Sequence, residues 1–169
     1  MNEILEKIGV LGIVPAVKIE NAEAVLPLGK ALLEGDLPVA EITFRTKAAE
    51  EAIRTLTQNL PEILVGAGTV LTVDQVKKAA AAGAKFIVAP GFNPNVVDYC
   101  LQNNIPMTPG INSPSFNEIA LERNLQILKF FPAESSGGVK FIKDMAGPYA
   151  NVKFIPTGGI NITNLNAYL

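Results

Sequence analysis

The sequence contains no histidine and only one cysteine, Cys100, in 169 residues. The absence of histidine excludes His-based acid–base catalysis, His-ligated metals and the usual serine or cysteine triads. One cysteine excludes an internal disulfide, argues against a structural zinc site and fits a reducing compartment. Any catalysis must therefore use lysine, glutamate, aspartate, tyrosine, serine, threonine or arginine.

Basic blocks and long apolar runs are missing as well. No run approaches the roughly 18 apolar residues that span a bilayer, and residues 1–7 carry acids where a secretory signal has bases. The 14 basic and 16 acidic residues give a net charge of −2, which disfavours nucleic acid and anionic membranes as partners.

What the chain does contain is a hydrophobic content of 49%, with β-type runs that recur at regular spacing. This content suits one domain over residues 1–169 with a buried core. The runs begin at residues 12, 38, 64, 86, 105, 127 and 152, and amphipathic stretches separate them. These stretches predict helices over 22–34, 47–58, 72–82, 94–103, 115–122 and 137–145, and a last one from Asn161.

Strands that alternate with helices in this way predict a parallel sheet of the α/β class. Glycine and proline at the strand exits favour a (β/α)₈ TIM barrel, whose active site lies at the carboxyl ends of its strands. An open doubly wound sheet is the alternative, but neither glycine-rich exit has a dinucleotide-binding fingerprint. Only about seven strands fit in the chain, so we expect a C-terminally shortened barrel.

Two opposite charges are predicted to point into this barrel. Alternation places Glu41 on the inward face of the second run and Lys129 on that of the sixth. One interpretation is a structural ion pair. The other is a catalytic amine, because burial favours the uncharged form of lysine, which can attack a carbonyl and form a Schiff base. Glu41 would then lie within proton-relay distance.

Polar groups at the strand exits fit an anionic substrate. Arg45 can bind a carboxylate in bidentate fashion, and Thr69 offers a hydroxyl beside glycines that permit close approach. Gly158 and Gly159 follow the seventh run, where barrels often bind phosphate. A Gly-Gly pair is more often only a turn.

With these residues in place, the chain resembles the bacterial 2-keto-3-deoxy-6-phosphogluconate (KDPG) aldolases, also called 4-hydroxy-2-oxoglutarate (KHG) aldolases. The resemblance runs along essentially the whole chain. Four segments carry it: EITFRT at 41–46, VGAGTV at 65–70, LKFFPAE at 128–134 and FIPTGGI at 154–160.

The resemblance implies a class I aldolase of carbohydrate metabolism that needs no metal or cofactor and forms a cytoplasmic homotrimer. It implies Lys129 as the Schiff-base lysine and Glu41 as the general acid/base. It further implies that the substrate binds at the strand exits. It also implies that the enzyme releases pyruvate in catabolism of the Entner–Doudoroff type. The residues for this are Arg45 and Thr69 for the carboxylate, Phe131 for the pocket wall, and Thr157, Gly158 and Gly159 for the substrate tail and its phosphate.

Family members run further at the C-terminus and supply an eighth strand there, which is where this sequence departs from the pattern. Two other functions stay open. One is a phosphosugar isomerase or epimerase that uses Glu41 as a base without a covalent lysine. The other is a shortened, inactive homologue that acts as a subunit or anion binder.

Overall fold

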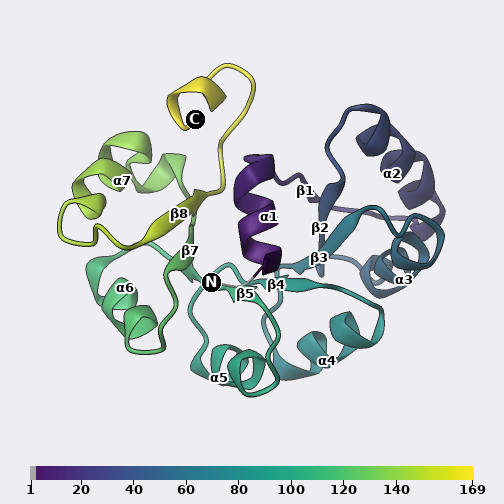
Figure 1. Ribbon diagram of the computed structural model, residues 1–169, viewed down its shortest axis with the longest axis horizontal. Coiled ribbons are helices and arrows are strands. Elements are labelled where there is room, and N and C mark those ends of the chain that lie inside the picture. The colour runs from purple at the N-terminus through teal and green to yellow at the C-terminus, as the bar shows by residue number, and fades with distance from the viewer. Residues whose placement is uncertain (1–2) are drawn as a thin grey trace. The chain divides into compact units, whose positions relative to one another are not determined.

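The computed structural model describes residues 3–169, which divide into two compact units. The first unit contains the chain up to Val88 together with Asn93–Met107, and the second contains Ala89–Phe92 and Thr108–Leu169. Figure 1 labels the helices and strands of both. Within residues 3–169, every helix is too short or too polar to traverse a lipid bilayer.

The first unit is built on a sheet whose strands follow one another in chain order. The order is β1–β2–β3–β4–β5, and β1 to β4 pair in parallel. Figure 1 shows α2, α3 and α4 following one another along the outer side of these strands. The bounds are α1 (Glu3–Leu11), β1 (Ala16–Val17), η1 (Ala22–Ala24), α2 (Val25–Glu34), β2 (Val39–Thr43), α3 (Ala49–Asn59), β3 (Leu64–Gly68), α4 (Val73–Ala81), β4 (Phe86–Val88), α5 (Pro94–Gln102) and β5 (Met107–Thr108).

Helix α4 begins where the sequence predicts it. The Thr72 hydroxyl accepts a hydrogen bond from the Gln75 backbone N–H, and the Gln75 side chain accepts one from the Thr72 N–H. This capping box satisfies two backbone donors that a helix start otherwise leaves open. The predicted start of this helix is confirmed.

Helix α1 was not among the predicted helices. Ile8 packs with Val39, Phe86 and Val88 of β2 and β4, whereas Val10 is exposed to solvent. The three strand residues form one buried cluster together with Ile8 of α1. Helix α1 is therefore part of the core of this unit.

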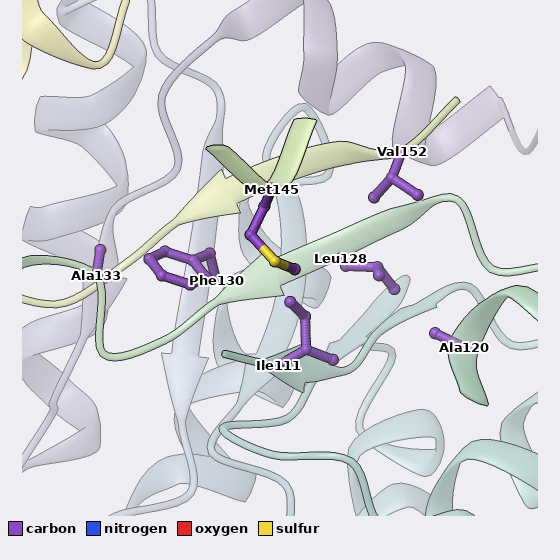
Figure 2. Close-up of a cluster of buried hydrophobic side chains, with 7 residues drawn as sticks. All are labelled: Ile111, Ala120, Leu128, Phe130, Ala133, Met145 and Val152. Carbon is purple, nitrogen blue, oxygen red and sulfur yellow. The ribbon is translucent and has the colours of Figure 1, made fainter. Parts of the chain in front are cut away.

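The second unit contains a three-stranded parallel sheet in the order β6–β7–β8. Figure 2 shows Leu128 and Phe130 of β7 in a cluster with Met145 of α7 and Ala120 of α6. Leu128 and Phe130 thus point toward the helices, which leaves Lys129, between them, for the other face of β7. The bounds are β6 (Gly110–Ile111), α6 (Pro114–Leu121), β7 (Ile127–Phe130), η2 (Glu134–Ser136), α7 (Gly138–Ala146), β8 (Lys153–Pro156) and η3 (Leu165–Ala167).

The fifth predicted run contains two short strands, β5 and β6, with Pro109 between them. Proline has no N–H to donate to a ladder, although the Pro109 carbonyl accepts a hydrogen bond of 3.0 Å from the Lys129 N–H. A Cβ at the next residue, Gly110, would overlap the Pro90 carbonyl. The eight strand segments of residues 3–169 thus correspond to the seven predicted runs.

The prediction of a helix from Asn161 onward is wrong. This segment consists of turns and the short η3 helix. The Asn161 side chain accepts hydrogen bonds from the backbone N–H and hydroxyl of Thr163, and Asn164 accepts from the Asn161 N–H. Such local side-chain bonds compete with helical backbone bonds.

Candidate active site

Glu41 lies in the middle of β2 and is 6% exposed. Its side chain lies over Gly68 at the end of β3. A Cβ at Gly68 would overlap Glu41 Oε1 and would lie 2.5 Å from Glu41 Cγ and Cδ. The missing side chain at Gly68 therefore provides the space that holds this carboxylate inside the first unit.

Replacing Gly68 by alanine should drive the Glu41 side chain from its position. We expect Gly68→Ala to lose about 1–3 kcal/mol of stability, as overpacked sites do, and to lose turnover in the reaction proposed below. Urea unfolding and steady-state kinetics measure both effects. The matched control is Gly9→Ala, because a Cβ there meets nothing within 4 Å. Full turnover in Gly68→Ala would show that the observed position of Glu41 is not needed.

Arg45 and Thr69 lie just beyond the carboxyl ends of two neighbouring strands, β2 and β3. The Phe44 N–H donates a 2.7 Å hydrogen bond to the Gly68 carbonyl and joins these two ends. Arg45 is exposed and Thr69 is half-buried. The first unit thus places an arginine and a threonine at neighbouring strand ends, and their guanidinium and hydroxyl groups suit a carboxylate.

Thr69 has a backbone conformation that is rare for its residue type. Its φ of +54° lies in the left-handed region, where a β-branched side chain is strained. The other non-glycine residues with positive φ among residues 3–169 are Asp36, Asn104 and Asn124, whose short polar side chains tolerate this region. Strain of this kind is concentrated at functional sites.

We expect Thr69→Gly to raise the free energy of unfolding by about 0.5–1 kcal/mol, since glycine adopts this conformation without the strain of a β-branched residue. The same variant should bind a keto-acid carboxylate more weakly. Urea denaturation and pyruvate titration measure the two effects. Asn104→Gly is the control, and its gain should be smaller because asparagine tolerates positive φ. A loss of stability in Thr69→Gly would contradict the assignment of strain.

Lys129 lies on β7 in the second unit and is 5% exposed. Its backbone pairs with Gly110 of β6 and Ile155 of β8. Its Nζ lies 5.4 Å from the centre of the Phe131 ring, a cation–π distance when the amine is protonated. Lysine side chains are seldom buried, so this amine is a candidate nucleophile.

Phe131 also contacts the turn that follows β8. A Cβ on Gly158 would lie 3.3 Å from two atoms of the Phe131 ring. Gly158 and Gly159 have φ values of +101° and +82°, so both need the conformational freedom of glycine. The carbonyls of Thr157 and Gly158 accept hydrogen bonds from Ala133 and Glu134, which fix the turn. The second unit thus brings Lys129, Phe131 and residues 157–159 together.

Two residues of the first unit acquire a role that the sequence did not assign. Gly68 makes room for Glu41, and Thr43 contacts Arg45 through a hydrogen bond. Alternation along β2 was the available signal, because it places Thr43 on the same face as Glu41 and Arg45. The contact partners of both residues depend on strand register, which alternation does not give.

Other candidate chemistry is limited within the described part of the chain. Cys100 is fully buried in α5, and burial raises the pKa of its thiol to about 11, so the reactive thiolate is scarce at neutral pH. Residues 3–169 contain no cluster of three or more acidic or cysteine side chains suited to a metal ion.

Comparison with known proteins gives consistent matches along the whole chain. The KDPG and KHG aldolase family matches residues 4–169. The 2-dehydro-3-deoxy-phosphogluconate aldolase of Haemophilus influenzae is 52% identical over 167 residues, which are 99% of this chain and 79% of that protein. The enzyme of the same name from Treponema pallidum is 46% identical over 100% of this chain and 80% of its own.

A solved structure gives the same result for the fold. The KDPG aldolase of Legionella pneumophila, with pyruvate captured at low pH as a covalent carbinolamine intermediate, has a TM-score of 0.90 and 39% identity. The match covers 92% of this chain and 76% of that chain. It confirms the predicted fold class, an α/β fold of the TIM-barrel class I aldolase type.

Proposed function

The chain belongs to the KDPG and KHG aldolase family, and from this premise we propose that it is a class I, Schiff-base aldolase that cleaves a 2-keto-3-deoxy sugar acid. The candidate substrates are KDPG, which would give pyruvate and glyceraldehyde 3-phosphate, and 4-hydroxy-2-oxoglutarate, which would give pyruvate and glyoxylate, and the protein cleaves one or both. The observation that carries the proposal is the buried amine of Lys129 beside the Phe131 ring.

Lys129 is the proposed nucleophile. Its uncharged amine adds to the C2 ketone and gives a carbinolamine, which loses water to form a protonated imine. A base removes the C4 hydroxyl proton, the C3–C4 bond breaks, and its electron pair moves toward the imine nitrogen as the aldehyde leaves. The resulting enamine takes a proton at C3. Water then hydrolyses the imine, which releases pyruvate and regenerates the amine.

Glu41 is the proposed general acid/base for these proton transfers, acting through a water molecule. Its burial over Gly68 supports this role, since a fixed carboxylate moves protons with little reorganisation. Glu41 and Lys129 belong to different units. The proposal that both residues act on one substrate rests on the family pattern. Separate variants of Lys129 and Glu41 test it.

The remaining residues are proposed to bind the substrate. Arg45 and Thr69 take the carboxylate that all these keto acids share. Thr157, Gly158 and Gly159 take the substrate tail and, in KDPG, its phosphate, and Phe131 lines the pocket. The two positive-φ glycines support this assignment, because a turn without side chains exposes backbone N–H groups to an anion.

The experiment that tests this function is borohydride reduction in the presence of pyruvate, run beside aldolase assays with both substrates. We expect a stable adduct of pyruvate size on the intact protein, together with pyruvate release. Turnover without any adduct would favour a non-covalent isomerase- or epimerase-like mechanism. A folded protein that gives neither result would support the inactive homologue.

We further propose that residues 1–169 fold as one domain and that the protein is a cytoplasmic homotrimer. The support is the family pattern and the similarity to bacterial aldolases over nearly the whole chain. A single cooperative unfolding transition and a trimer mass by analytical ultracentrifugation are the expected results.

A further inference from the structure

The buried hydroxyl of Thr43 joins two elements of the first unit. Thr43 lies at the end of β2 and is 2% exposed. Its hydroxyl donates a 2.8 Å hydrogen bond to the Val17 carbonyl of β1. It also accepts a 3.1 Å hydrogen bond from Arg45 Nε. A rigid, buried group therefore holds one end of an exposed guanidinium.

The direction of these two bonds is fixed by chemistry. A hydroxyl has one hydrogen and two lone pairs. Because the hydrogen is directed to Val17, a lone pair of the same oxygen is left for the Nε–H of Arg45. The interaction uses only the inner N–H of the guanidinium, so both terminal NH₂ groups stay available for a bidentate contact with a carboxylate.

We propose that Thr43 is a positioning residue, which orients Arg45 toward the carboxylate of the keto acid. This inference rests on the proposed function. An exposed arginine loses side-chain conformational entropy when it is ordered. The bond to Thr43 orders Arg45 in part before the substrate binds. Loss of this bond should therefore weaken substrate affinity rather than slow the covalent steps.

The test uses Thr43→Val, which has nearly the same shape but no hydroxyl. We expect KM for both aldol substrates and the half-saturating pyruvate concentration in borohydride trapping to rise about 10-fold, with kcat changed less than about 3-fold. Thr43→Ser should restore the wild-type values. The control is Thr57→Val, because the Thr57 hydroxyl also bonds a distant carbonyl, that of Ala82, at 2.9 Å.

Two results would overturn the proposal. One is a Thr43→Val enzyme with unchanged KM, and the other is a fall in kcat alone. Proton exchange at Arg45 Nε, followed by NMR, gives a readout that does not depend on activity. It should be slow in the wild type and at least about 5-fold faster in Thr43→Val, and equal rates would reject the positioning role. A wild-type protein that neither binds nor cleaves a keto acid would reject the proposed function while this NMR result stood.

Discussion

Lys129→Met is expected to abolish the pyruvate adduct and to lower kcat/KM at least about 1,000-fold for both substrates. Methionine has a similar length and is apolar, so it keeps the contact with the Phe131 ring but cannot form an imine. The loss of a covalent nucleophile is among the largest effects that a single substitution has on an enzyme. Intact-mass analysis after borohydride reduction and steady-state assays measure it.

Stability distinguishes this result from a failure to fold. Methionine fills nearly the same volume as the lysine side chain, so Lys129→Met should stay folded and unfold in a single cooperative urea transition. The matched control is Lys153→Met on the adjacent strand β8, where the lysine is exposed. It should keep both adduct and turnover. An adduct that persists in Lys129→Met, or that maps to another lysine, would remove Lys129 from the mechanism.

The position of Lys129 on the face of β7 opposite to Leu128 and Phe130 was predictable because strand side chains alternate. A period of two assigns Leu128 and Phe130 to the helix side and leaves Lys129 for the other face, and the buried cluster confirms this assignment (Figure 2). The same alternation placed Glu41 and Thr43 together on β2. The order of strands and helices was predictable because β-type runs and amphipathic stretches alternate along the sequence.

Other features depend on contacts between distant residues. The division of the fifth run at Pro109 follows from local backbone chemistry, yet the close approach of Gly110 to Pro90 exists only in the folded unit. Helix α1 precedes the first β-type run and so lies outside the repeat of strands and helices, and its place in the core depends on packing of Ile8 against distant strand residues. The segment after Asn161 was predicted as a helix from its place in the repeat, but its asparagine side chains form turns.

The strain at Thr69 also could not be predicted from the sequence. The VGAGTV segment indicates close backbone approach through its glycines, but it does not show that the threonine itself has positive φ. A glycine would adopt this conformation more easily. The presence of threonine therefore supports a role for its hydroxyl, which the Thr69→Gly variant separates from stability.

Glu41→Gln is expected to keep the pyruvate adduct and to lower kcat about 1,000-fold, within the usual range for a general acid/base. Glutamine has the same shape as glutamate, so the side chain should remain in the space over Gly68, but it cannot accept and return a proton. A second measurement isolates this step. Exchange of the pyruvate C3 hydrogens in D₂O requires interconversion of imine and enamine, and it should slow in parallel with kcat.

Two further variants serve as comparisons for Glu41→Gln. Glu62→Gln, at an exposed position of the same unit, should leave adduct, exchange and turnover unchanged. Gly68→Ala should reproduce the Glu41→Gln pattern, with adduct retained and exchange slowed, if the carboxylate acts from its observed position. Unchanged turnover in Glu41→Gln would remove the carboxylate from the mechanism. If Gly68→Ala loses turnover while Glu41→Gln keeps it, the loss is due to altered packing between β2 and β3 and not to proton transfer.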